Sequence, residues 1–199
     1  MTKNLVTCRR NADLKYKHTT AYAFPTTCLE LFSQELEKNL VAKTAVQNKK
    51  KRGNLMLAIG SDHGGFELKG HITEHLKEKG IEVKDFGVYN EDSVDYPDCA
   101  KPVCEAVLNG ECERGILICG TGIGISMAAN KFNGIRAALC GDVFSAKMAK
   151  EHNNANIICL GGRVTGRELA NMIVDTYLDA EFQGGRHAER IKKIHAIEK

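Results

Sequence analysis

A cysteine stands directly before a glycine-rich loop near the middle of the chain. Cys119 closes an apolar run and is followed by Gly120-Thr121-Gly122-Ile-Gly124. Free backbone N–H groups at the start of a helix in this loop would suit an anion, such as a phosphate, thiolate or enolate oxygen. Cys119 is therefore either a small buried core residue or a thiolate that acts as a nucleophile or a proton-transfer base.

The same loop has a second interpretation. Its GxGxG spacing approaches the GxGxxG pattern of dinucleotide-binding loops, and Asp142 lies at a suitable distance beyond it to bind a ribose. A glycine pattern of this kind does not by itself distinguish a nucleotide from another anion. A nucleotide-binding module therefore stays open at this point.

Acidic, basic and imidazole side chains follow other apolar runs. Asp62 and His63 follow the first run, Arg163 follows the fifth, and His152 and Asn153 close the helical pattern between the fourth and the fifth. His152, at the end of a helix, is either a capping residue or an acid/base group. His63 and His152 do not stand at the short HxxxH spacing of a metal centre, and no CxxC pattern accompanies them, so we expect no metal site.

The last helical pattern carries two arginines on one face. Arg186 and Arg190 stand four positions apart, which places them on the same side of a helix. They are either solvated surface side chains or a clamp for a phosphate, a group that the guanidinium fork suits. His187 adds a third cation, and Gly184 and Gly185 free the N-terminus of the helix.

These residues punctuate a regular alternation of apolar runs and helical patterns. The expected strands cover residues 55–59, 81–86, 115–119, 135–140 and 156–160. The expected helices cover residues 66–79, 96–108, the stretch from the glycine loop to 131, 143–152, 165–178 and 185–197. The alternation predicts βαβ units and a parallel sheet of five strands. In such α/β folds ligands bind at the carboxyl ends of the strands, where the glycine-rich loops lie.

The composition changes sharply after the first 53 residues. That segment holds 11 basic and 4 acidic side chains, a net charge of +7, whereas the remainder holds 17 and 21, a net charge of −4. Its most basic stretch is Lys49-Lys50-Lys51-Arg52, a run typical of a solvated linker. We therefore expect no nucleic-acid partner.

We expect residues 55–199 to form one folded domain. Residues 1–54 are expected to be an extension that is either disordered, with one short helix over 29–46, or a mis-assigned start. The second hypothesis follows from the Lys-Lys-Lys-Arg-Gly sequence upstream of Met56. Purine-rich codons there would resemble a bacterial ribosome-binding site before a start codon.

The apolar runs and cysteines bear on location. No apolar run approaches the ~20 residues of a membrane span, so we expect no membrane partner. Of the eight cysteines, Cys119, Cys140 and Cys159 lie in strand-like runs, and none shows CxxC spacing. This pattern is typical of reduced thiols in a cytoplasmic protein.

Five segments together resemble one enzyme family. The segments are Ile59-Gly-Ser-Asp-His-Gly-Gly, Ser93-Val-Asp-Tyr-Pro-Asp, Ile118-Cys-Gly-Thr-Gly-Ile-Gly-Ile-Ser-Met-Ala-Ala-Asn-Lys, Glu151-His-Asn-Asn-Ala-Asn and Gly184-Gly-Arg-His. In this order they resemble ribose-5-phosphate isomerases of the B type, in a family that also includes galactose-6-phosphate and allose-6-phosphate isomerases. The resemblance runs from about Met56 to Lys199 and makes residues 55–199 a sugar-phosphate isomerase domain.

The resemblance implies a fold, a reaction and an assembly. The fold is a Rossmann-like three-layer α/β/α sandwich around the five-stranded parallel sheet. The reaction is the cofactor-free interconversion of D-ribose 5-phosphate and D-ribulose 5-phosphate through an enediolate, in the non-oxidative pentose phosphate pathway. The assembly is a homodimer, or a tetramer, with active sites at the subunit interface.

The resemblance also implies catalytic roles. Cys119 is the base that moves the proton between C1 and C2, and Thr121 binds or polarises the sugar beside it. His152, aided by Asp62, opens the furanose ring, and Asn153 stabilises the enediolate oxygen together with backbone N–H groups of the loop. Those loop positions are Gly120, Gly122 and Gly124.

The remaining implied roles concern binding. The phosphate ligands are His63, Arg163, Arg186 and Arg190, and Tyr96 lines the pocket. An allose-6-phosphate or galactose-6-phosphate isomerase is the nearest alternative, because the sequence does not reveal the depth of the sugar pocket. A nucleotide-binding module and a non-catalytic partner subunit are alternatives from other classes.

Overall fold

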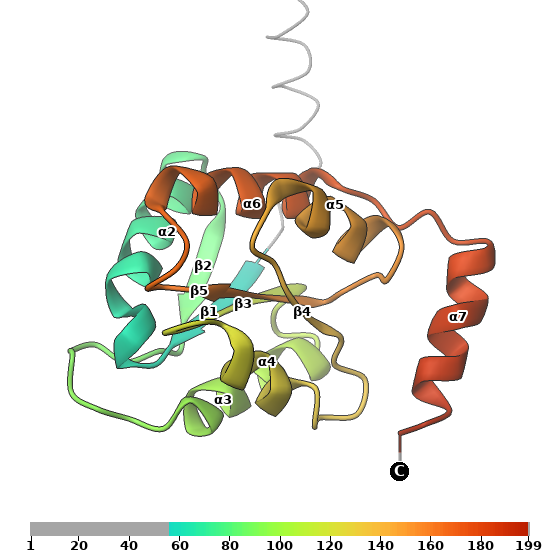
Figure 1. Ribbon diagram of the computed structural model, residues 1–199, viewed down its shortest axis with the longest axis horizontal. Helices are drawn as coiled ribbons and strands as arrows, with labels where there is room; N and C mark the ends of the chain where they lie inside the picture. The colour runs from blue at the N-terminus through green and yellow to red at the C-terminus, as the bar shows by residue number, and fades with distance from the viewer. Residues whose placement is uncertain (1–55, 199) are drawn as a thin grey trace, which may run out of the picture. The chain divides into compact units, whose positions relative to one another are not determined.

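The computed structural model describes residues 56–198, which form five parallel strands and the helices around them (Figure 1). The strands are β1 (Met56–Ser61), β2 (Glu82–Asp85), β3 (Arg114–Cys119), β4 (Ala137–Leu139) and β5 (Ile157–Gly161), in the spatial order β2-β1-β3-β5-β4. The helices are η1 (His63–Gly65), α2 (Phe66–Glu78), α3 (Tyr96–Leu108), α4 (Ile123–Ala129), α5 (Val143–Glu151), α6 (Arg167–Asp179) and α7 (Arg186–His195).

Helices cover both faces of the sheet, as the alternation of side chains along each strand requires. On β1, Leu57 and Ile59 face the core under α2, α5 and α6, whereas Ala58 faces the core over α3 and α4. On β5, Ile158 and Cys159 divide between the two cores in the same way. The prediction of a three-layer α/β/α sandwich with a five-stranded parallel sheet is therefore confirmed.

The bounds of the elements follow the sequence closely, with one clear difference. The expected strand over 135–140 is shorter, because the Ile135 N–H donates to the Phe132 carbonyl at 3.0 Å and the Arg136 N–H donates to the Asn156 side chain at 2.8 Å. These donors are used before the β4–β5 ladder begins. The expected extension over residues 1–54 lies outside the described residues. Within residues 56–198, no helix is long and apolar enough to cross a membrane.

A buried tyrosine ties α6 to the segment that precedes β5. Tyr177 is fully buried, and its hydroxyl donates to the Ala155 carbonyl at 2.9 Å. The Arg114 guanidinium lies 5.4 Å from the Tyr177 ring and donates to the carbonyls of Tyr177 and Leu178. This cluster holds the end of α6 against the amino edge of the sheet.

We expect Tyr177→Phe to lower the free energy of unfolding by about 1–2 kcal/mol, because the Ala155 carbonyl then loses a buried donor. Urea denaturation measures this change. Tyr89→Phe is the matched control, since the Tyr89 hydroxyl also donates to a backbone carbonyl but the residue is 76% exposed. Equal losses in both variants would contradict the role of burial.

Candidate active site

The loops after β1, β3 and β5 meet at the carboxyl edge of the sheet, because these three strands are neighbours. The Gly162 N–H donates to the Cys119 carbonyl at 2.8 Å, and the Arg163 N–H donates to the Gly120 carbonyl at 3.0 Å. The Asp62 N–H donates to the backbone of β3 at 3.1 Å. Backbone hydrogen bonds therefore lock the three loops together.

The loops approach so closely that two of the contacts require glycine. A Cβ atom on Gly162 would lie 2.4 Å from the Gly64 carbonyl oxygen. A Cβ atom on Gly65 would lie 2.7 Å from the Ile118 carbonyl oxygen. The Asp62 carboxylate accepts the Gly65 N–H at 3.1 Å, which completes the turn after β1.

Cys119 lies at the end of β3 with its thiol inside the loop junction. The residue is 4% exposed, and the Gly122 N–H donates to its Sγ at 3.1 Å. The backbone N–H therefore points directly at the sulfur atom. Gly122 reaches this position with a φ of 77°, a left-handed conformation that glycine adopts readily.

The other described cysteines differ from Cys119 in their surroundings. Burial raises the pKa of Cys104 to about 12. Burial, with Asp142 nearby, raises the pKa of Cys140 to about 11. These thiols stay protonated in the core. The six cysteines within residues 56–198 form no disulfide with one another.

Three further side chains surround the loop junction. The His63 Nδ1 accepts the Val94 N–H at 3.3 Å. The Tyr96 ring lies over the start of α4, where a Cβ on Gly124 would be 2.7 Å from its Cζ. The exposed Thr121 hydroxyl accepts the Ile123 N–H at 3.4 Å.

Arg163 completes this set. Its side chain lies along the loop, within 3.7 Å of where a Cβ on Gly120 would stand. We call the set the carboxyl-edge group. It contains Asp62, His63, Tyr96, Cys119, Gly120, Thr121, Gly122, Gly124 and Arg163.

The remaining predicted site residues lie at the opposite edge of the sheet. His152 caps the C-terminus of α5, and Asn153 follows it, just before β5 begins at Ile157. The β5 ladder pairs Ile157 with Gly115 at the start of β3 and reaches Cys119 only at its other end. We call the second set the amino-edge group. It contains His152, Asn153, Arg186, His187 and Arg190.

A stack of two imidazoles organises the amino-edge group. The His152 and His187 rings lie 4.2 Å apart with an interplanar angle of 8°. Burial lowers the pKa of His187, and the nearby charges of His152, Arg186 and Arg190 lower it further. The His187 ring, whose neutral form is favoured, therefore supports the His152 ring by stacking, a contact that its sequence position beside two arginines did not reveal.

Asp142 has a local structural role. Its carboxylate accepts the Ser145 N–H at 2.8 Å and the Ser145 hydroxyl at 2.7 Å, so it caps the N-terminus of α5. These hydrogen bonds lower the pKa of Asp142. In the described part of the chain, no three His, Cys, Asp or Glu side chains are grouped so that they could hold a metal ion.

A thiol held against a backbone N–H, with histidine and arginine side chains at the carboxyl edge of a parallel sheet, defines an enzyme class that binds a small anionic substrate. Comparison with known proteins narrows this class. The family described as Ribose/Galactose Isomerase matches residues 57–194. The chain belongs to this family.

Individual relatives of this chain belong to the same family. Ribose-5-phosphate isomerase B of Escherichia coli is 52% identical over 142 residues, which cover 71% of this chain and 95% of the relative. The structure of ribose-5-phosphate isomerase B of Clostridium thermocellum is 60% identical, with a TM-score of 0.72 over 72% of this chain and 97% of that one. That of Mycoplasma genitalium, with bound ribulose 5-phosphate, is 46% identical, with a TM-score of 0.70 over 73% and 97%.

We expect Gly162→Ala to lower the free energy of unfolding by about 1–3 kcal/mol, because its Cβ would collide with the Gly64 carbonyl. Gly70→Ala is the control, since a Cβ there meets nothing within 4 Å in the exposed middle of α2. That change should raise the free energy of unfolding by about 0.5–1 kcal/mol. A Gly162→Ala protein as stable as the native chain in urea would refute the close packing of the loops.

Proposed function

We propose that this chain is an aldose–ketose isomerase that interconverts D-ribose 5-phosphate and D-ribulose 5-phosphate, a reaction of the non-oxidative pentose phosphate pathway. The similarity to the E. coli enzyme and to the M. genitalium protein with bound ribulose 5-phosphate supports this substrate. The observation that carries the proposal is the Gly122 N–H donated to the Cys119 Sγ. Isomerisation needs a base that lies beside hydrogen-bond donors, and these donors stabilise the negative charge that develops on the substrate oxygen.

In the proposed reaction the Cys119 thiolate removes the proton from C2 of the open-chain aldose. The electron pair moves toward the aldehyde oxygen and produces an enediolate. Backbone N–H groups of the loop at Gly120–Gly124 stabilise this oxygen, together with Asn153, and the Thr121 hydroxyl binds the sugar. The thiol then returns the proton at C1, while the hydroxyl proton of O2 passes to O1. The net change is a proton shift within one substrate, so we propose no cofactor.

Ring opening and phosphate binding complete the mechanism. We assign to His152, aided by Asp62, the transfer of a proton to the furanose ring oxygen. His63 and Arg163 bind the phosphate from the carboxyl-edge group, and Arg186 and Arg190 bind it from the amino-edge group. The two groups must therefore act on the same molecule of substrate.

A homodimer satisfies this requirement. The carboxyl-edge and amino-edge groups of one chain lie at opposite ends of the β3–β5 ladder. The edge strand β4 is flanked by exposed apolar side chains: Met127 is 63% exposed, Leu139 44% and Phe144 71%. An exposed apolar surface at a sheet edge is typical of a protein–protein interface. We propose that a second copy covers it and supplies the partner subunit's His152 and arginines.

We place the activity in the cytoplasm, where the free thiols of this domain stay reduced. The first test is conversion of ribose 5-phosphate to ribulose 5-phosphate by the purified chain, with a chelator present and no cofactor added. Robust turnover is expected. Loss of activity under these conditions would contradict a cofactor-free isomerase.

We expect Cys119→Ala to lower kcat by roughly 10²–10⁴-fold, because the proton-transfer base is lost. Binding should survive, and thermal stabilisation by ribose 5-phosphate measures it. Cys104→Ala removes a protonated core thiol and serves as the control with native turnover. Native kcat in Cys119→Ala would show that another group is the base.

A mixture of two inactive variants tests the shared site. Cys119→Ala and His152→Asn should each lose activity with ribose 5-phosphate as homodimers. After subunit exchange at equal amounts, each hybrid dimer has one site with both residues intact, so roughly a quarter of native activity should return. If each active site were built within one chain, the mixture would stay as inactive as its components.

A further inference from the structure

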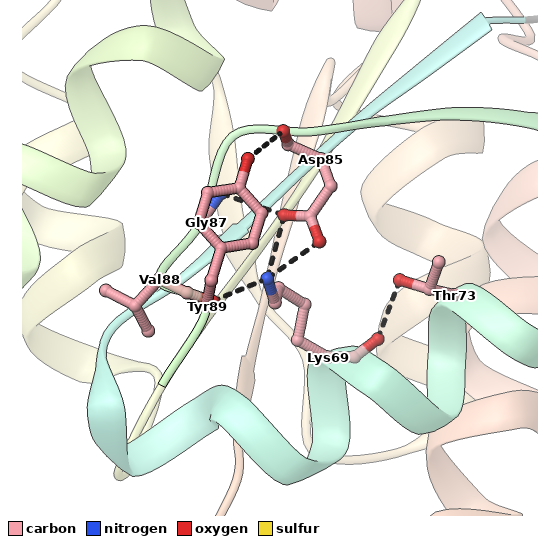
Figure 2. Close-up of polar contacts among 6 residues, drawn as sticks. All are labelled: Lys69, Thr73, Asp85, Gly87, Val88 and Tyr89. Atoms are coloured by element: carbon pink, nitrogen blue, oxygen red, sulfur yellow. Dashed lines mark hydrogen bonds and ion pairs between the residues drawn. The ribbon is translucent and has the colours of Figure 1, made fainter. Parts of the chain in front are cut away.

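Lys69 is a buried charged side chain that the proposed mechanism does not use. It lies on α2, is 2% exposed, and places its Nζ 2.8 Å from both carboxylate oxygens of Asp85 and 2.8 Å from the Val88 carbonyl oxygen (Figure 2). The rings of Phe66 and Tyr89 lie 5.8 and 5.1 Å from the same Nζ. These acceptors use the donors of the ammonium, and the rings face its charge.

The chain after β2 wraps around this ammonium. Asp85 also accepts the Gly87 N–H at 2.9 Å, and its carbonyl accepts the Tyr89 hydroxyl at 3.0 Å, as Figure 2 shows. Gly87 is pressed onto β1, where a Cβ on it would lie 2.7 Å from the Ser61 nitrogen. We call residues 85–89, together with Lys69, the lysine clamp. Through Gly87 and the Val88 N–H, which donates to the Ser61 carbonyl at 3.3 Å, it contacts the residue before Asp62.

The lysine clamp begins a loop whose other end reaches the candidate site. Residues 86–95 connect β2 to α3, and the Val94 N–H donates to the His63 Nδ1 at 3.3 Å. Between the two ends the loop borders an open surface pocket of about 490 Å³. Its lining includes Phe86, Val88, Ser93, Val94, Asp98 and Cys99. The course of the loop beside this pocket therefore depends on its two held ends and on the packing of Phe86, Val88 and Val94 against the core over α3 and α4.

The contact from Val94 decides which nitrogen of His63 carries the proton. Because a backbone N–H donates to Nδ1, that nitrogen is the acceptor and the neutral ring carries its proton on Nε2. An Nε2–H group is a donor that suits a phosphate oxygen. If the loop moved, Nδ1 would be free to take the proton, and Nε2 would present a lone pair to the anion.

We propose that Lys69 is a positioning residue for phosphate binding. The Lys69 ammonium holds residues 85–89 in place. These residues fix the course of the loop between β2 and α3, and the loop in turn holds the Val94 N–H on the His63 Nδ1. The role of His63 as a phosphate ligand rests on the proposed function. The effect of Lys69 on the His63 tautomer does not depend on which sugar phosphate is turned over.

A lysine variant tests the proposal in the full chain. Lys69→Met keeps the apolar stem and removes the charge. Lys79→Met is the matched control, because Lys79 caps the C-terminus of the same helix and pairs with Asp175, away from the loop. The readouts are the ¹⁵N chemical shifts of the His63 ring, the Kd for inorganic phosphate, and KM and kcat with ribose 5-phosphate.

The native chain and Lys79→Met are expected to hold His63 as the Nε2–H tautomer. Lys69→Met is expected to mix the tautomers, weaken phosphate binding about 10-fold and raise KM by a similar factor, with kcat changed less than about 3-fold. A folded Lys69→Met protein with the native tautomer and native phosphate affinity would overturn the proposal.

A second variant covers the case in which Lys69→Met does not fold. Asp85→Asn keeps an acceptor for the Gly87 N–H but removes the charge that faces the ammonium. It should shift the His63 tautomer and the phosphate Kd in the same direction by a smaller factor, and native values would overturn the proposal. If neither the native chain nor any variant turns over ribose 5-phosphate, the proposed function fails. The His63 tautomer and the phosphate Kd then still decide the role of Lys69.

Discussion

The backbone contact between three loops is the constraint on which the candidate site depends. β1, β3 and β5 are adjacent and parallel, so their loops emerge side by side and bond to one another through main-chain groups. Only glycine allows the approach of Gly162 to the Gly64 carbonyl. Burying the polar backbone groups of three loops together costs desolvation free energy, and the hydrogen bonds between the loops offset this cost. Cys119 is held in this junction by strand geometry and needs little support from other side chains.

The polarity of the sandwich separates the two halves of the proposed site. Helices run antiparallel to the strands they follow, so a helix that returns from the carboxyl edge ends at the amino edge. His152 therefore caps α5 far from Cys119 within the same chain, and α7 continues the chain beside the sandwich on that side (Figure 1). The shared active site proposed here is a consequence of this polarity. In the proposed homodimer, assembly and catalysis depend on the same surface.

Charged groups in the interior hold segments that packing alone does not place. Lys69 organises the start of the loop between β2 and α3, and Arg114 anchors the end of α6 beside Tyr177. A buried charge is costly unless its partners are complete. Both side chains donate hydrogen bonds to backbone carbonyls. Such bonds fix the course of the main chain, whereas a bond to a side chain would fix only that side chain.

The sequence by itself determined the elements and the family. Periodicity and glycine and proline positions predicted five strands and the start of α3 at Tyr96, because these signals are local along the chain. The ordered segments around Cys119 and His152 pointed to the isomerase family in the same way. Only the tertiary structure decided that Cys119 and His152 lie at opposite edges, that His187 stacks on His152, and that Lys69 reaches Asp85. These relations join residues distant in sequence, so they depend on the path of the folded chain, which no local pattern records.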